Sequence, residues 1–132
     1  MNPDTTPPAL PTPGADAPDG SIVGAVRQDG SAIYIAAIRE DADYTRAEKD
    51  AGKLNVHGHQ DWRVPSLNDW QVLLPNIQSG ALASVFNPAS EKTAYRASDL
   101  VTTHSAWCFD VNKGERQSDF KCVDRPTIFV RG

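Results

Sequence analysis

The sequence predicts a small α+β domain. Segments with the alternating apolar pattern of β-strands lie near the start and at the end of the chain, and two segments with helical periodicity lie between them. Long polar connections join these segments, which is typical of a fold that keeps helices and antiparallel strands apart. A chain of 132 residues suits one such domain. We therefore expect two helices, a small antiparallel sheet and long loops.

The first 20 residues differ in composition from the rest. They contain six of the ten prolines, and Leu10 is their one large aliphatic residue. Such a segment cannot bury enough apolar surface to offset the entropy lost on ordering. We expect residues 1–20 to be a disordered Pro-rich tail and residues 21–132 to be a single folded domain. The tail is either a plain linker or a docking segment, since Pro-rich chains are preformed extended ligands.

Two strands and a helix are expected at the start of the domain. Residues 22–27 and 32–38 alternate in the manner of strands on either side of an Asp-Gly turn signal. Asp43 is then placed to cap a helix that runs from Tyr44 to Lys53. We expect the first strand to pair with a closing strand at residues 127–131.

The ten residues 61–70, with the sequence DWRVPSLNDW, predict an extended segment that turns into a second helix. Ser66 is a good N-cap, and Asp69 can complete a capping box. Four apolar residues then recur on one helical face: Leu67, Trp70, Leu73 and Leu74. Pro75 is expected to end this helix. A short helical piece at 80–86 and an irregular stretch to about residue 103 are expected to follow.

A β-hairpin is predicted near the end of the chain. Its strands are 106–112 and 116–123, joined by a turn at Lys113-Gly114. The pairing that joins the apolar faces sets Phe109 opposite Phe120 and Trp107 opposite Cys122, so Cys108 lies on the other face. We therefore expect two free thiols. A slip of one residue would pair the cysteines, but it would set Asp110 against Phe120.

Two segments of the chain resemble a known family. The first is DWRVPSLNDW, and the second is SAWCFDVNKG at residues 105–114 with the ending FVRG. Together they resemble the motifs of the bacterial domain family typified by the C-terminal domain of the Legionella collagen-like protein, over roughly residues 22–132. The chain departs from the family at residues 95–98, where Tyr-Arg-Ala-Ser replaces the common Tyr-Trp-Ser-Ser. It departs again where Phe129 precedes Val130, because the family often has an arginine-cysteine pair near its end.

The resemblance implies a C-type-lectin-like fold, the fold that formylglycine-generating oxidases share. It also implies structural roles for Trp62, Arg63, Trp70 and Trp107, with the arginine bridging loop carbonyls or an acid. Most members of the family have no assigned function. The paired reactive cysteines of the oxidases have no counterpart on one strand end here, which argues against carrying their activity across.

Charge and hydropathy exclude two kinds of partner. A net charge of −4 does not favour nucleic-acid binding, which needs a cationic face. The chain has no apolar stretch of membrane-spanning length, so we expect no membrane insertion. It also has no signal peptide at its start, which predicts a cytoplasmic protein, or a secreted or surface protein if a leader has been removed. Four basic residues near the end keep a specific anionic ligand open: Arg116, Lys121, Arg125 and Arg131.

Few residues indicate catalysis. His57-Gly58-His59 could ligate a metal with Asp61 or His104, but such spacing arises often by chance, so we expect solvated or backbone-bonded histidines. A nucleophile made from Cys108 or Cys122 with His104 has nothing to lower the thiol pKa. We therefore expect no catalytic residue, no metal and no cofactor.

Function is expected to lie in the surface loops of the scaffold. The segment 87–104 is rich in short polar side chains that suit adaptable hydrogen bonding. The sequence thus predicts a non-enzymatic recognition domain for a protein partner, with a phage-encoded or host-directed factor as one form of it. The alternatives are an adhesion domain that binds glycans and a divergent formylglycine-generating-type enzyme. The candidate binding residues are Tyr95, Arg96, Ser98, Asp99, Thr102 and His104.

Overall fold

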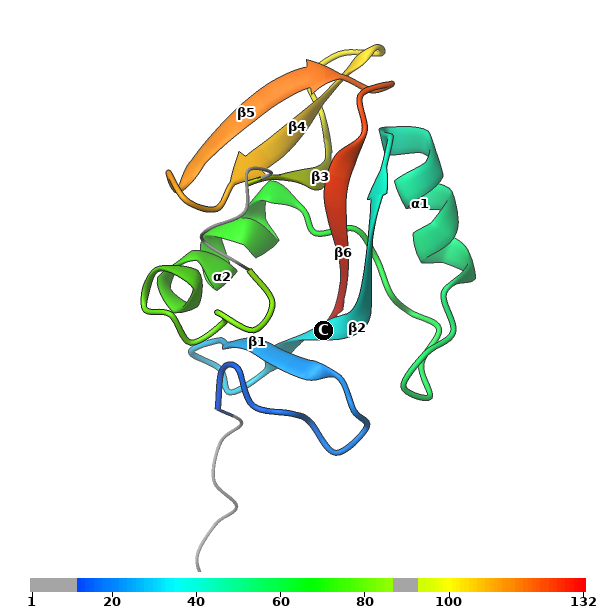
Figure 1. The fold of residues 1–132 in the computed structure, drawn as a ribbon. Helices are drawn as coiled ribbons and strands as arrows, with labels where there is room; N and C mark the ends of the chain where they lie inside the picture. The colour runs from blue at the N-terminus through cyan, green and yellow to red at the C-terminus, as the bar shows by residue number, and fades with distance from the viewer. Residues whose placement is uncertain (1–11, 87–92) are drawn as a thin grey trace, which may run out of the picture.

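The computed structural model describes residues 12–86 and 93–132, and it confirms the α+β class (Figure 1). Within these ranges it has two helices and two three-stranded antiparallel sheets, where the sequence predicted one small sheet. The first sheet has the order β1-β2-β6 and the second the order β3-β4-β5. No helix in the described ranges is long and apolar enough to cross a membrane.

The first sheet is built on β2 (Ala32–Ala42), which pairs with β1 (Ile22–Val26) on one side and with β6 (Arg125–Arg131) on the other. The expected pairing of the first and last strands is therefore wrong. β2 has 11 residues. It pairs with β1 at one edge and with β6 at the other, so it lies between these two shorter strands. Its ladder with β6 is interrupted between Ile35 and Arg39, where β2 bulges.

Residues 14–20 belong to the folded part, so the predicted domain boundary at residue 20 is too late. The Gly14 N–H donates to the Val23 carbonyl at 2.7 Å, and the Val23 N–H donates to Ala15 at 2.9 Å. Ala17 is buried. These contacts cover the outer edge of β1, which composition alone could not predict. Residues 1–11 of the predicted tail lie outside the described residues.

Both helices begin where the sequence predicts. Asp43 accepts the Arg46 N–H at the start of α1 (Tyr44–Lys53). Ser66 and Asp69 form a reciprocal capping box at the start of α2 (Leu67–Gln78). The expected end at Pro75 is wrong, because the helix continues for another turn. That turn is held by the Asn76 side chain, which donates to the Gly24 carbonyl of β1 at 3.1 Å.

The connection after α2 is also more ordered than predicted. Residues 79–86 form successive turns in place of a short helix. The expected irregular stretch contains a strand, β3 (Ala94–Leu100), paired with β4 (Ser105–Asp110). Residues 87–92 lie outside the described residues.

The hairpin joins β4 to β5 (Glu115–Phe120) in a different register from the expected one. Phe109 lies opposite Arg116 and Trp107 opposite Ser118. Local turn chemistry sets this register: the Asp110 carboxylate accepts the N–H groups of Asn112 and Lys113, each at 3.0 Å, and Gly114 has a φ of 68°. Phe120 and Cys122 are therefore exposed, contrary to expectation.

Both cysteines are free, as expected. Cys108 does lie on the opposite face of β4 from Phe109, but it is buried, because that face of the second sheet is covered as well. The alternating pattern of one strand could not predict that both faces of its sheet are covered.

Two hydrophobic clusters share the first sheet. In the larger one, Trp70 stacks on Phe109 with the ring centroids 5.7 Å apart. The smaller one packs Trp62 and Phe129 against α1. Trp62 and Trp70 are buried, and Trp107 is half-buried at the edge of the larger cluster under the Arg116 guanidinium. Trp62 and Trp70 are therefore core residues, as expected, whereas Trp107 only borders the core.

Candidate functional site

Two of the predicted binding residues are buried. Tyr95 packs against Trp70 and Phe86 in the larger cluster, and burial raises the pKa of its hydroxyl. The Arg96 side chain has no exposed area. The expectation that these residues lie on a surface loop is wrong, because they belong to β3, which pairs with β4.

Ser98 and Asp99 hold the second sheet to the helices. The Asp99 carboxylate accepts the Leu67 N–H at 3.0 Å, at the start of α2. The Ser98 N–H donates to the Pro65 carbonyl, and its own carbonyl accepts the Tyr44 hydroxyl, both at 2.9 Å. These contacts give both residues a structural part in joining elements that are distant in sequence.

Arg96 is the centre of a buried charged cluster between the second sheet and β6. Its Nη2 donates to the Val123 carbonyl, and its Nη1 lies 3.9 Å from Asp119 Oδ1. Asp119 also pairs with Arg125, whose Nε donates to Oδ2 at 2.6 Å. Two guanidinium groups thus share one carboxylate. Burial lowers the pKa of Arg96 and raises that of the adjacent Cys108 thiol, which does not suit a nucleophile.

Thr102 and His104 are exposed, and they lie in the loop between β3 and β4. The Val101 and Thr102 N–H groups both donate to the Ser105 carbonyl, at 2.9 and 3.2 Å. Thr102 Oγ1 accepts from the N–H groups of His104 and Ser105. This loop is therefore fixed by its own hydrogen bonds.

Exposed apolar side chains gather around the same loop. Leu100 is 47% exposed, Val101 42% and Phe120 65%. Leu100 lies opposite Ala106 of β4 and Phe120 lies opposite the neighbouring Ser105, so Leu100, Val101 and Phe120 lie at the same end of the second sheet, on either side of β4. We call Leu100, Val101, Thr102, His104 and Phe120 the tip surface. Sequence reasoning found its two polar members but missed the apolar ones, because the predicted register buried Phe120.

A shallow hollow of about 370 Å³ adjoins the tip surface. Phe120 and His104 form part of its lining. Asp43 and Lys121 add one charge of each sign, and Cys122 also contributes to its wall. The hollow therefore offers one aromatic ring beside hydrogen-bonding groups.

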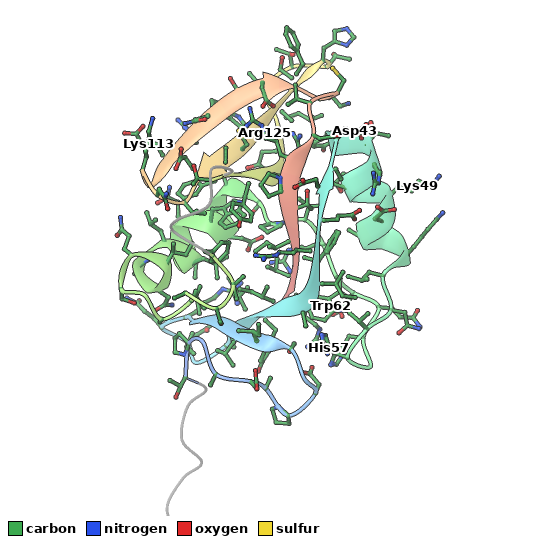
Figure 2. The ribbon with its side chains drawn as sticks, viewed as in Figure 1. Asp43, Lys49, His57, Trp62, Lys113 and Arg125 are labelled. Carbon is green, nitrogen blue, oxygen red and sulfur yellow. The ribbon has the colours of Figure 1, made fainter. Side chains whose placement is uncertain are left out.

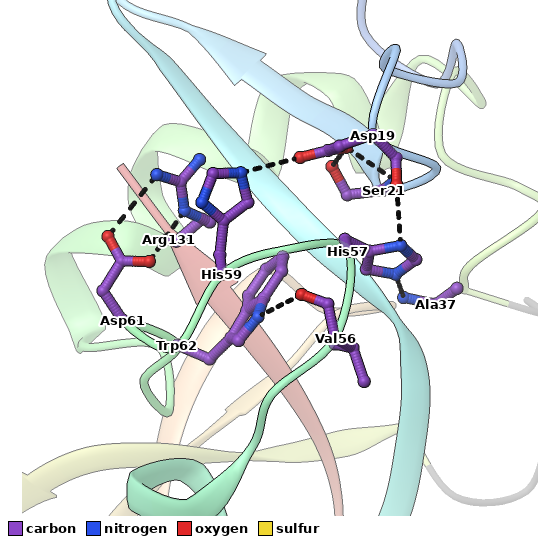
Figure 3. Close-up of polar contacts among 9 residues, drawn as sticks. All are labelled: Asp19, Ser21, Ala37, Val56, His57, His59, Asp61, Trp62 and Arg131. Atoms are coloured by element: carbon purple, nitrogen blue, oxygen red, sulfur yellow. Dashed lines mark hydrogen bonds and ion pairs between the residues drawn. The ribbon is translucent and has the colours of Figure 1, made fainter.

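The two histidines of the loop 57–59 face structural partners (Figure 3). His57 Nε2 accepts the Ala37 N–H of the β2 bulge at 3.1 Å, so the proton of the neutral ring lies on Nδ1, 3.1 Å from the Asp19 carbonyl. His59 Nε2 lies 3.2 Å from the Asp19 carboxylate. His57 has a φ of 55°, a conformation that its two backbone contacts maintain.

Neighbouring residues add further contacts that hold the loop 57–59 in place. Trp62 Nε1 donates to the Val56 carbonyl at 3.2 Å, and Arg131 Nε donates to Asp61 at 2.9 Å (Figure 3). The Arg131 contact lowers the pKa of Asp61. Arg63 donates to Asp69 and to the Gly132 carbonyl, so it bridges an acid and a carbonyl as expected. Within the described ranges, no three His, Cys, Asp or Glu side chains are grouped to hold a metal ion.

The basic residues near the end of the chain do not form one anion site. Arg116 lies over Trp107 and Lys121 over Tyr44, each 4.9 Å from the ring centroid. Arg125 and Arg131 are paired with separate carboxylates. Figure 2 shows Arg125 near the second sheet, far from His57 and Trp62 at the other end of the molecule.

No known family model matches this chain, and no curated protein matches it.

Proposed function

We propose that this chain is a non-enzymatic recognition domain that binds a protein partner through the tip surface. The observation that carries the proposal is the gathering of Leu100, Val101 and Phe120 at one end of the second sheet. Exposed apolar side chains that lie together with polar ones at one end of a molecule are typical of protein contact sites. Ile38, the other large hydrophobic residue with comparable exposure in the described part of the chain, lies on β2.

The energetics favour a protein over a purely polar ligand. Covering a phenylalanine side chain stabilises a complex by roughly 1.5–3 kcal/mol before association costs. Thr102, His104 and Lys121 supply a polar rim that can fix orientation. Because the loop is held by its own hydrogen bonds, little conformational entropy is lost when it docks.

The scaffold and location belong to the same proposal. We propose that the fold is C-type-lectin-like, as the sequence resemblance implies, and two helices with two small antiparallel sheets are compatible with that. A cytoplasmic location and a phage-encoded or host-directed role stay predictions from the sequence.

The hollow beside Phe120 favours glycan binding as a second candidate. An aromatic ring next to Asp43, Thr103 and His104 can stack on a sugar ring while side chains bond its hydroxyls. Glycan binding would require Phe120 and the hollow but not Leu100, so the two functions make different demands.

A pull-down with quantified stoichiometry tests the proposal. Val101→Asp should abolish capture of a stoichiometric protein partner, because it places a charge in the apolar contact. Ile38→Asp is the matched control, since Ile38 is 43% exposed and Val101 42%. If both variants retain the partner equally, the tip surface is not the binding site. Binding of an oligosaccharide that Phe120→Ala abolishes and Val101→Asp leaves intact would select the glycan function instead.

A further inference from the structure

The outer edge of β5 is open in the described part of the molecule, whereas the edges of the other outer strands are covered at least in part. The outer edge of β1 is covered by residues 14–17, and that of β6 by Arg63, which exchanges two hydrogen bonds of 2.8 Å with Val130. On β3, the Ser98 N–H donates to Pro65. β5 lies at the outside of the second sheet (Figure 1), and beyond its ladder with β4 its backbone makes one turn bond, from the Val123 N–H to the Phe120 carbonyl.

The direction of the free groups on β5 follows from one contact. The Lys121 N–H donates to the His104 carbonyl at 2.9 Å, toward β4. Backbone groups alternate in direction along a strand, so those of Arg116, Ser118 and Phe120 point away from β4. The three corresponding side chains are exposed. Both the backbone and one row of side chains are thus available to a further strand.

The sequence of β5 and the next residue is complementary to itself. With a two-fold axis at Ser118, antiparallel pairing sets Glu115 opposite the second copy's Lys121 and Gln117 opposite the second copy's Asp119. It also sets Arg116 opposite the second copy's Phe120. Each pair occurs twice. Glu115 with Lys121 and Arg116 with Phe120 join groups that attract, and Gln117 lies opposite an Asp119 whose carboxylate is already neutralised by Arg125.

The neighbouring registers lack this property. An axis at Gln117 sets Glu115 against Asp119, and an axis at Asp119 sets that carboxylate against its own copy. An axis at Arg116 sets two guanidinium groups together. Like charges directly opposite one another destabilise a strand pair, so these three registers are less favourable than the one centred on Ser118.

We propose that β5 pairs with β5 of a second copy of this chain, antiparallel and centred on Ser118, to form a two-fold dimer with a continuous six-stranded sheet. About six main-chain hydrogen bonds join the copies, from Arg116, Ser118 and Phe120 of each. Such an interface is isologous, which is the commonest symmetry of homo-oligomers.

The dimer gives Phe120 a partner. Arg116 lies over the half-buried Trp107, with Cζ 4.9 Å from the ring centroid. The second copy's Phe120 reaches the other face of this guanidinium and stacks on it, so the most exposed large apolar side chain becomes covered. Leu100, Val101, Thr102 and His104 stay at the two outer ends, so each copy of the dimer binds a partner through these members of the tip surface, and Phe120 contributes to that contact only in the monomer.

Sedimentation of the full chain over a concentration series tests the dimer. We expect a species of twice 14.3 kDa that dissociates on dilution. Ser118→Pro removes an N–H that points away from β4, and proline is tolerated at a strand edge, so this variant should fold and stay monomeric. Ser118→Ala is its control and should dimerise like the native chain. A native chain that is monomeric at all concentrations would overturn the proposal.

A charge exchange tests the register. Glu115→Lys should weaken dimerisation roughly tenfold, because it sets two lysines together at both ends. Adding Lys121→Glu should restore it, and failure of this rescue in a folded double variant would exclude the register centred on Ser118. Folding of each variant is checked by circular dichroism.

Crosslinking tests whether the two copies pair in the proposed geometry or only associate. In a Cys122→Ser background, Ser118→Cys should oxidise to a covalent dimer, because residues opposite one another on a strand pair have Cα atoms about 5.5 Å apart. Lys113→Cys, in the turn, should not. This result is independent of the recognition proposal, since Val101→Asp should leave the dimer intact and Ser118→Pro should leave each tip surface intact.

Discussion

A single carboxylate organises the interior beside the second sheet. Asp119 serves both Arg125 and the buried Arg96, and its Oδ1 with the Nε and Nη1 atoms of Arg96 has no hydrogen-bond partner in the described part of the chain. Nothing local in the sequence predicts this, because the three residues lie on three different strands. The Arg96 guanidinium occupies buried space at an electrostatic cost.

Substitutions of Asp119 and of Arg96 should change the free energy of unfolding by different amounts. Asp119→Asn should lower the free energy of unfolding by about 2–3 kcal/mol, because it leaves two guanidinium groups without a counter-charge and one of them is partly solvated. Arg96→Met should change it by no more than about 1 kcal/mol, since an apolar side chain of similar length fills the same space. Urea denaturation measures both. An Arg96→Met loss larger than that of Asp119→Asn would contradict this assignment.

At the scale of the element, the helix caps were predicted correctly, whereas the long-range strand pairing and the hairpin register were not. Asp43, Ser66 and Asp69 cap their helices because capping depends on residues within one turn. The pairing of β2 with β6 and the burial of β3 depend on partners more than 30 residues away. The exposed state of Phe120 depends on a turn that Asp110 fixes earlier in the sequence than predicted. Composition likewise missed the docking of residues 14–20 on β1.

Docking of that segment can be tested at Gly14. Its φ is 87°, and a Cβ there would lie 2.1 Å from the Ala81 carbonyl oxygen. Gly14→Ala should therefore lower stability by more than the ~1 kcal/mol expected from backbone strain alone. Gly30→Ala is the matched control, because Gly30 has a φ of 88° with nothing within 4 Å of the added atom. Equal losses in thermal denaturation would mean that the segment is not held against Ala81.

The contribution of the same segment to the stability of the fold should depend on pH. Hydrogen bonds from Ser21 hold the pKa of Asp19 below its ordinary value of 3.8. A carboxyl group whose pKa is lowered on folding stabilises the folded state above its ordinary pKa, and this contribution disappears as the pH falls through the lowered value. The stability difference between the native chain and Asp19→Asn should therefore shrink as the pH falls below about 4. Denaturation at a series of pH values measures it, and a difference that grows in acid would contradict this account.

At the scale of the whole molecule, the two clusters are parts of one structure. Adjacent residues of β2 and β6 enter different clusters: Ile35 and Val130 enter the larger, and Ala36 and Phe129 the smaller. Neither cluster can lose its strands without exposing the other. The molecule should therefore unfold in one cooperative transition although it has two sheets.

Two phenylalanines test this coupling. Phe129→Ala should lower the free energy of unfolding by about 3–5 kcal/mol, because Phe129 is fully packed in the smaller cluster. Phe120→Ala should change it by less than about 0.5 kcal/mol when the protein is dilute enough to be monomeric, since that ring is exposed. In Phe129→Ala the near-ultraviolet circular dichroism of the tryptophans and the far-ultraviolet signal of the backbone should still change at the same temperature. Because Trp70 lies in the larger cluster, a tryptophan transition that separates from the backbone transition would mean that the two clusters unfold independently.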